Sequence, residues 1–214
     1  IFHPDCLASL FSVYESVFSG KGAILGINPW RDNLEKSIAT SELTVLDSPR
    51  DPEAFPFMAF DDEGFRTQKT TLVENGVLKT FFHNSATAEE MGVPNTFTAA
   101  RSPKGHLGVS GSNMRILPGK TSTANLKEGE YLEILQMQGL GSGSNAISGD
   151  FSVGISGHVK KDGEIVKPFR GVTLSGNFFE MLKNVSLDEQ DTTNATRSFF
   201  SPHMRFHSLS IGGN

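Results

Sequence analysis

The stretch GDFSVGISGHVKKDGEIVKPFRGVTLSGNFFEMLKN, residues 149–184, carries the clearest local pattern of the chain. Apolar residues alternate with small or polar residues from Phe151 to Val159. Because successive side chains of a strand point to opposite faces, this alternation predicts a half-buried β-strand. Asp162 and Gly163 follow it and predict a tight hairpin turn, since both central residues of a type I′ turn need a positive φ.

The second half of this stretch predicts two shorter strands and a helix. One strand runs through residues 165–166 and is expected to stop at Pro168, which has no N–H to donate to a neighbouring strand. Another strand is expected over 172–175. Residues 176–177 then lead into a short apolar helix over 178–182. The predicted order is therefore strand, tight turn, strand, strand and capped helix.

Near the start of the chain, residues 5–19 predict an amphipathic helix. Pro4 and Asp5 suit its first turn, and Gly20 is expected to end it. One stripe at helical spacing is formed by its apolar residues, which are Leu7, Leu10, Phe11, Tyr14, Val17 and Phe18. On this pattern alone, the helix is expected to pack its apolar face into the core.

Short strands and turns dominate the rest of the chain. The further strands that we expect cover residues 41–47, 67–73, 77–82, 114–117, 130–138 and 203–211. Asn75-Gly76 predicts the turn of a hairpin, and Ser85 and Gly92 are expected to cap and end a helix over 85–91. Residues 93–113 and 139–149 are expected to be loops. The expected fold class is α+β, mainly antiparallel β in a hairpin-rich sheet or a barrel-like domain, with a few short helices.

We expect two regions, an N-terminal helix and loop over residues 1–40 and a β-rich domain over 41–214. A chain of 214 residues can bury a sizeable core without disulfides or metals. The first residue is Ile1 rather than Met, and a helix follows almost at once. We therefore expect the C-terminal part of a longer protein, or a processed chain.

Composition excludes several classes of protein. The formal net charge of −5 argues against nucleic-acid binding, which usually needs a basic face. No apolar run approaches the roughly 18 residues of a membrane span. Cys6 is the only cysteine, so the chain forms no intrachain disulfide and no thiolate zinc cluster. That fits a reducing compartment.

Two patterns are candidates for chemistry. Asp61, Asp62 and Glu63 precede Gly64 and could bind a metal ion or act as general acid or base. The interpretation that we favour is a solvated turn in which Asp bonds to its own backbone. His203 and His207 are four residues apart, as zinc-binding histidines of a helix are, but they lie in an expected strand. Four strand residues span roughly 13 Å, so we exclude a shared metal and identify no catalytic residue.

Six segments, in this order, resemble the C-terminal half of the TldD/PmbA family. They are FDDEG (60–64), LVENGVLK (72–79), SGDFSVG (148–154), DGEIV (162–166), Pro168 with VTLSGN (172–177), and LSIGG (209–213). The family was once described as modulators of DNA gyrase and is now regarded as peptide-processing proteases. Each segment alone is a modest turn-and-strand motif, whereas their order and spacing carry the resemblance over nearly the whole chain.

The resemblance also implies where a metal would be expected. TldD-like subunits carry a His-Glu-x-x-x-His helix that binds zinc, and a Cys ligand near the C terminus. If the helix before Gly20 is the counterpart, its ligand positions fall at Phe11, Ser12 and Ser16. Phe has no donor atom and neutral Ser is a poor zinc ligand, and residues 194–214 contain no Cys.

The GDFS form of the central motif resembles the PmbA (TldE) branch, whose subunit lacks zinc and pairs with a TldD partner. The resemblance thus implies a cytoplasmic, non-catalytic subunit of a two-subunit metalloprotease that acts on unfolded peptides, with zinc on the partner. The candidate groove or interface residues are Asp61, Asp62, Glu63, Gly64, Gly149, Asp150 and Phe151. Loops 93–113 and 139–149 could border such a groove, where an extended peptide adds to a strand edge.

Three alternatives remain open from the sequence. The protein could be a self-sufficient metallopeptidase whose ligands lie upstream of Ile1. It could be a stand-alone peptide-binding module, as a homodimer of the same fold. Asp61, Asp62 and Glu63 could also act directly in catalysis.

Overall fold

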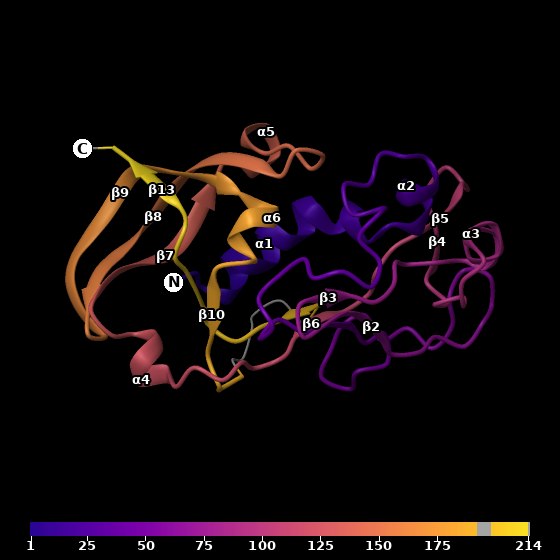
Figure 1. Cartoon of the computed structure of the whole chain (residues 1–214), viewed down its shortest axis with the longest axis horizontal. Coiled ribbons are helices and arrows are strands. Elements are labelled where there is room, and N and C mark those ends of the chain that lie inside the picture. Colours follow the sequence, from indigo (N-terminus) through magenta and orange to yellow (C-terminus); the bar gives the residue numbers. More distant parts are fainter. Residues whose placement is uncertain (192–197, 214) are drawn as a thin grey trace.

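The structure, a computed structural model, describes residues 1–191 and 198–213. Within these residues the fold is α+β, with mostly antiparallel open sheets and short helices, which confirms the predicted class. Figure 1 shows a sheet of long strands at one end of the molecule and smaller sheets and loops at the other end. Of the two forms expected, the hairpin-rich sheet is present, and none of the described sheets closes into a barrel.

The long-stranded sheet contains the stretch that was most informative in the sequence. Its strands, in spatial order, are β13 (Ser210–Gly212), β9 (Glu164–Asn177), β8 (Asp150–Lys161) and β7 (Glu130–Gln138), all antiparallel to their neighbours. Asp162 and Gly163 have φ angles of +50° and +89°, as the predicted turn requires. Phe151, Val153 and Ile155 alternate into the core, so the predicted half-buried strand is confirmed.

The strand β9 corrects the prediction that Pro168 interrupts pairing. It runs without a break from Glu164 to Asn177, and Pro168 is paired with His158 of β8. On the other side, β13 pairs with β9 only over residues 173–175. Proline is tolerated in a ladder where its nitrogen faces an open edge, because no hydrogen bond is then lost. Sequence alone did not show which strand would be at the edge.

The second sheet lies beyond the first helix in Figure 1. Its strands, in spatial order, are β11 (Phe199–Phe200), β6 (Met114–Ile116), β1 (Val45–Asp47), β2 (Thr70–Glu74) and β3 (Val77–Leu78). Only the β11–β6 pair is parallel among these. Asn75 and Gly76 have φ angles of +48° and +79°, so the second predicted hairpin turn is also confirmed.

Two further pairs of short strands complete the described sheets. The pair β4 (Ala99–Arg101) and β5 (Leu107–Val109) is a hairpin inside residues 93–113, so the long loop predicted there contains two short strands. The other pair is β10 (Val185–Leu187) and β12 (Met204–Phe206). The single tail strand predicted over 203–211 is in fact two strands, β12 and β13, and β10 was not predicted.

The helices are short. Their bounds are α1 (Pro4–Tyr14), the 3₁₀ turn η1 (Glu15–Phe18), α2 (Gly20–Ile24), α3 (Ser85–Met91), α4 (Thr123–Leu126), α5 (Leu140–Gly143) and α6 (Phe178–Met181). Gly20 begins α2 instead of ending the first helix, and a Cβ atom there would lie 2.4 Å from the ring of His83. Close packing, not a left-handed turn, therefore explains this glycine. The cap of α3 is Asn84 rather than Ser85, whereas Gly92 ends that helix as predicted.

The helix α1 links the two larger sheets. It contacts β7 on one side and β11 on the other, and its apolar stripe is buried in the main core. Tyr14 is fully buried and stacks on Phe178 with ring centroids 4.2 Å apart. Its hydroxyl lies 3.1 Å from the backbone oxygens of both Gly149 and Asp150. The first helix is thus bonded to the start of β8.

The division of the chain at residue 40 stays a prediction.

Candidate functional site

A pocket of about 320 Å³ lies beside α1, where the resemblance puts the metal-ligand positions. Phe11 and Ser12 line it, whereas Ser16 lies in η1 and is not part of its wall. The opposite wall comes from β6 and from residues 111–112, which follow the β4–β5 hairpin. The structure therefore places two of the three predicted positions at one cavity.

The side chains at these positions do not fit a zinc ion. Phe11 offers no donor atom, and the hydroxyls of Ser12 and Ser16 are neutral oxygens, which zinc rarely selects. Among the described residues, no group of three or more His, Cys, Asp or Glu side chains could hold a metal ion. No reaction step through a metal can therefore be assigned to the described residues.

Two carboxylates border the pocket, and sequence reasoning missed both. Asp47 ends β1 with only 1% of its surface exposed, and its Oδ1 accepts hydrogen bonds from the backbone N–H of Ser112 (2.8 Å) and Asn113 (3.0 Å) and from the Ser112 hydroxyl (2.9 Å). Its Oδ2 is buried and has no hydrogen-bond partner in the described structure. Glu15 uses Oε1 to accept from the backbone N–H of Gly111, at 3.0 Å.

The electrostatic environment of Asp47 is unusual for a carboxylate. Burial raises the pKa of Asp47, and the nearby charge of Glu15 acts in the same direction, while the hydrogen bonds from Ser112 and Asn113 oppose them. None of the residues that line the described pocket is Lys, Arg or His. The cavity is thus acidic on one side, and the described residues of its wall supply no positive charge.

The predicted acidic turn over residues 61–64 uses its carboxylates to hold backbone. Asp61 is 6% exposed and accepts from the N–H groups of Glu63 and Phe65 through Oδ1. Asp62 accepts from the N–H of Arg101 at 2.6 Å. Glu63 accepts from both the N–H and the hydroxyl of Ser85, at the start of α3. These contacts are those of a structured turn that joins the β4–β5 hairpin to α3.

The other predicted group, residues 149–151, lies at the start of β8. Gly149 has a φ of +84°, and a Cβ atom there would meet the ring of Phe179 at 2.6 Å. The hydrogen bond from Asn177 Nδ2 to Asp150 Oδ1, 2.9 Å long, is the main cause that lowers the pKa of Asp150. Phe151 is buried in the core. The two predicted groups are not brought together, because residues 61–64 pack near α3 and residues 149–151 near α1 and α6 (Figure 1).

The histidines that were rejected as a metal pair have separate partners. His203 Nδ1 lies 3.9 Å from Asp188, whereas His207 Nε2 lies 3.0 Å from the Ser186 hydroxyl. His203 and His207 lie directly before and after β12, within the strand that the sequence predicted for this segment. Burial lowers the pKa of both histidines.

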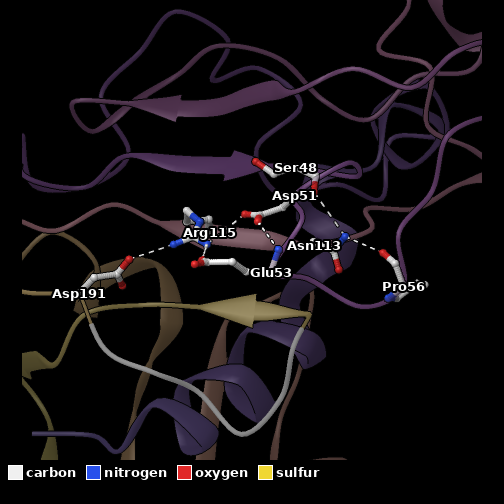
Figure 2. A network of polar contacts seen from close by, with 7 residues as sticks. All are labelled: Ser48, Asp51, Glu53, Pro56, Asn113, Arg115 and Asp191. Atoms are coloured by element: carbon white, nitrogen blue, oxygen red, sulfur yellow. Dashed lines mark hydrogen bonds and ion pairs between the residues drawn. The ribbon is translucent and has the colours of Figure 1, made fainter.

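A polar network ties residues 48–56 to β6 (Figure 2). Arg115 donates to Asp51 at 3.0 Å and to Asp191 at 2.9 Å, and it lies 3.4 Å from Glu53. Its guanidinium also covers the ring of Phe200 at 4.2 Å. Asn113 donates to the backbone oxygens of Ser48 and Pro56. The network thus joins this loop, β6 and β11 around one cation.

We expect Arg115→Met to lower the free energy of unfolding by about 2 kcal/mol, because it leaves the mostly buried carboxylate of Asp51 without its partner. The side chains of Arg115 and Asp51 are only 17% and 14% exposed. Urea unfolding followed by circular dichroism measures the effect. The matched control is Arg31→Met, which removes an ion pair whose side chains are 51% and 79% exposed. It should cost less than about 0.5 kcal/mol, and equal losses for both variants would contradict the prediction.

No helix in the described part of the chain is both long and apolar enough to cross a bilayer.

Residues 1–213 match the PmbA/TldA metallopeptidase C-terminal domain, and the chain belongs to this family. This result confirms the resemblance inferred from the six segments. A protein of Haemophilus influenzae, named metalloprotease PmbA homolog, is 30% identical over 188 residues, which are 86% of this chain and 39% of that protein.

Two crystal structures show the same fold. One is a candidate modulator of a DNA gyrase from Thermotoga maritima, with a TM-score of 0.89 and 27% identity, covering 99% of this chain and 48% of that one. The other is TldE from Thermococcus kodakarensis, with a TM-score of 0.84 and 26% identity, covering 97% of this chain and 48% of that one. This chain thus spans less than half of the length of each of these three proteins.

Proposed function

We propose that the chain is part of a PmbA (TldE)-like, zinc-free subunit of a cytoplasmic two-subunit metalloprotease, and that the zinc lies on a TldD-like partner. The observation that carries this proposal is the set Phe11, Ser12 and Ser16, which replaces the zinc ligands that the resemblance implies. Relatives named PmbA and TldE support the branch. The chain contributes scaffold and peptide contacts rather than a catalytic residue.

The substrate that we propose is an unfolded peptide, held in extended form. Among the described strands, β13 and β7 end the long sheet, and all three residues of β13 are exposed. An extended peptide can add to such an edge through main-chain hydrogen bonds, which select little for sequence. Residues 61–64 and 149–151 remain the proposed groove or interface residues, in two groups that lie apart in the fold. Residues 139–149, which follow β7, would then border the groove, whereas residues 93–113 lie beside α3 at the other end of the molecule (Figure 1).

We expect the full-length protein, purified alone, to contain far less than one zinc per chain and to cleave no unfolded peptide. Adding a subunit that carries the His-Glu-x-x-x-His helix should restore cleavage, because the metal then activates water on the partner. Elemental analysis and a fluorogenic peptide assay measure the two outcomes. A partner whose zinc-binding histidines are replaced by Ala is the control.

Two alternatives predict different results in the same experiment. Stoichiometric zinc and cleavage without a partner would identify a self-sufficient metallopeptidase with ligands upstream of Ile1. A homodimer that binds peptide and never pairs with a zinc subunit would identify a stand-alone binding module. Either result would overturn the proposal.

A direct catalytic role for the acidic turn is tested separately. In the reconstituted pair, the combined replacement Asp61→Asn, Asp62→Asn and Glu63→Gln should lower stability and leave the cleavage rate of the folded protein unchanged. These carboxylates are occupied as acceptors of backbone N–H groups. Loss of cleavage with unchanged stability would favour catalysis by the turn.

A further inference from the structure

We propose that the pocket beside α1 binds an organic ammonium group carried on a small apolar body. The group would lie between the carboxylates of Asp47 and Glu15, and the body would lie against the rings of the pocket wall. This inference goes beyond the proposed function, because it concerns a ligand of this chain alone and holds with or without a partner subunit.

The charge of the cavity is the first argument. Asp47 and Glu15 both line it, and no basic side chain belongs to its described wall. Two carboxylates with no counter-ion among the described wall residues, in a partly closed space, attract a cation, since their mutual repulsion is relieved when one binds. An anionic ligand would be repelled by this arrangement, and a neutral ligand would gain less from it than a cation would.

The unpaired oxygen of Asp47 is the second and independent argument. Oδ1 of this residue is satisfied by three donors, whereas the buried Oδ2 has none in the described structure. Buried polar atoms of folded proteins nearly always have a partner, because leaving one unpaired costs free energy. An ammonium group brings three donors and can satisfy this oxygen.

The walls indicate the rest of the ligand. Phe11, Phe82 and Phe199 contribute rings, and Met114 contributes a thioether. Aromatic faces stabilise a nearby ammonium group through their quadrupole, and together these side chains accept an apolar body. A cavity of about 320 Å³ holds a molecule of several carbon atoms rather than a bare ion. Two carboxylates also fall short of the four ligands that a structural metal usually takes.

Two sources share this chemistry, namely the free amino terminus of a peptide with an apolar first residue and the ammonium of a lysine side chain. Leucinamide represents the first, and Nα-acetyl-lysinamide represents the second. Acetyl-leucinamide has the same apolar body as leucinamide without the charge, so it is the neutral control. Whichever charged probe binds more tightly identifies the source.

The experiment titrates each probe into protein labelled with carbon-13 at its methionine methyl groups. Met114 lines the pocket, whereas Met181 and Met204 are buried in the main core and serve as internal references. We expect at least one charged probe to shift the Met114 signal in a saturable way, with acetyl-leucinamide binding at least about tenfold more weakly. Replacement of Met114 by Leu assigns the signal.

The variants Asp47→Asn and Glu15→Gln should each weaken the charged probe by about tenfold, while Asp32→Asn, an exposed change of the same charge, should not. Glu15→Gln keeps the test valid if the Asp47 variant does not fold, since Glu15 is partly exposed whereas Asp47 is buried. Equal binding of acetyl-leucinamide, no shift of Met114 with either charged probe, or unchanged affinity in Glu15→Gln would overturn the proposal.

Discussion

Replacing Gly157 with alanine is expected to lower the free energy of unfolding by about 3 kcal/mol, because the added methyl group has no space. Gly157 pairs with Ile134 beside an irregularity in the β7–β8 ladder. A Cβ atom there would lie 1.9 Å from the backbone oxygen of Glu133 and 3.2 Å from the backbone nitrogen of Leu135. Backbone atoms inside a ladder cannot move aside without breaking its register, so the strain is not relieved by a side-chain rotation.

Gly154→Ala in the same strand is the matched control. The nearest atom to a Cβ at this position is 3.9 Å away, which is ordinary contact. Because alanine restricts the unfolded chain more than glycine does, this variant should change stability by no more than about 1 kcal/mol and can be stabilising. Urea unfolding of both variants, followed by circular dichroism, gives the comparison. If Gly157→Ala unfolds at the same urea concentration as Gly154→Ala, the close approach of β7 and β8 is wrong.

Tyr14→Ala should have the largest effect, a loss of about 4 kcal/mol, because it removes a fully buried ring from the middle of the core. The ring stacks on Phe178 at an interplanar angle of 7° and also contacts Phe179 edge-on. Its loss leaves a cavity between α1 and α6, which are otherwise joined through the same aromatic cluster. Thermal unfolding and urea unfolding should both detect the loss.

Tyr14→Phe separates packing from hydrogen bonding. A phenol has one O–H to donate, so the bonds to Gly149 and Asp150 share one proton. We therefore expect a loss of only about 1 kcal/mol. Hydrogen exchange of the amides near residue 149 should become faster while the rest of β8 stays protected. A loss as large as that of Tyr14→Ala would show that the ring contributes little.

The elements that sequence predicted well are those set by local chemistry. The turns at Asn75-Gly76 and Asp162-Gly163 need positive φ, and few residues other than Asn, Asp and Gly adopt it readily. The alternating pattern that begins at Phe151 arises because only one face of this strand is buried. Asn177 caps α6 through its own side chain, which bonds to the N–H groups of Phe179 and Glu180. Each of these signals lies within a few residues of its effect.

The parts that sequence missed depend on contacts between distant segments. Gly20 was expected to end a helix, but it is a glycine because the backbone of Phe82 and the ring of His83 approach it. Pro168 was expected to end a strand, and only the position of β13 shows why it does not. Short strands such as β4 and β5 carry too few residues for a periodic pattern.

The candidate site shows the same division. Phe11, Ser12 and Ser16 were found from the resemblance, and two of them line the pocket. Asp47 gave no signal in sequence, because an aspartate at the end of a strand is usually exposed and ends the strand in solvent. Its role depends on residues 112–113, some 65 positions later, which bond to one of its oxygens, while the other has no partner among the described residues.

The open edge of β9 also bears on how copies of this protein meet one another. An unpaired strand edge is a template for polymerisation, and proteins protect such edges with proline and with like charges. Lys167, Pro168 and Arg170 are exposed along the part of β9 that β13 does not cover. Two such edges repel each other, and Pro168 offers no N–H to an incoming strand. These three residues thus disfavour fibrous self-association along β9, and they adjoin the exposed Ile165 and Val166, which would otherwise favour it.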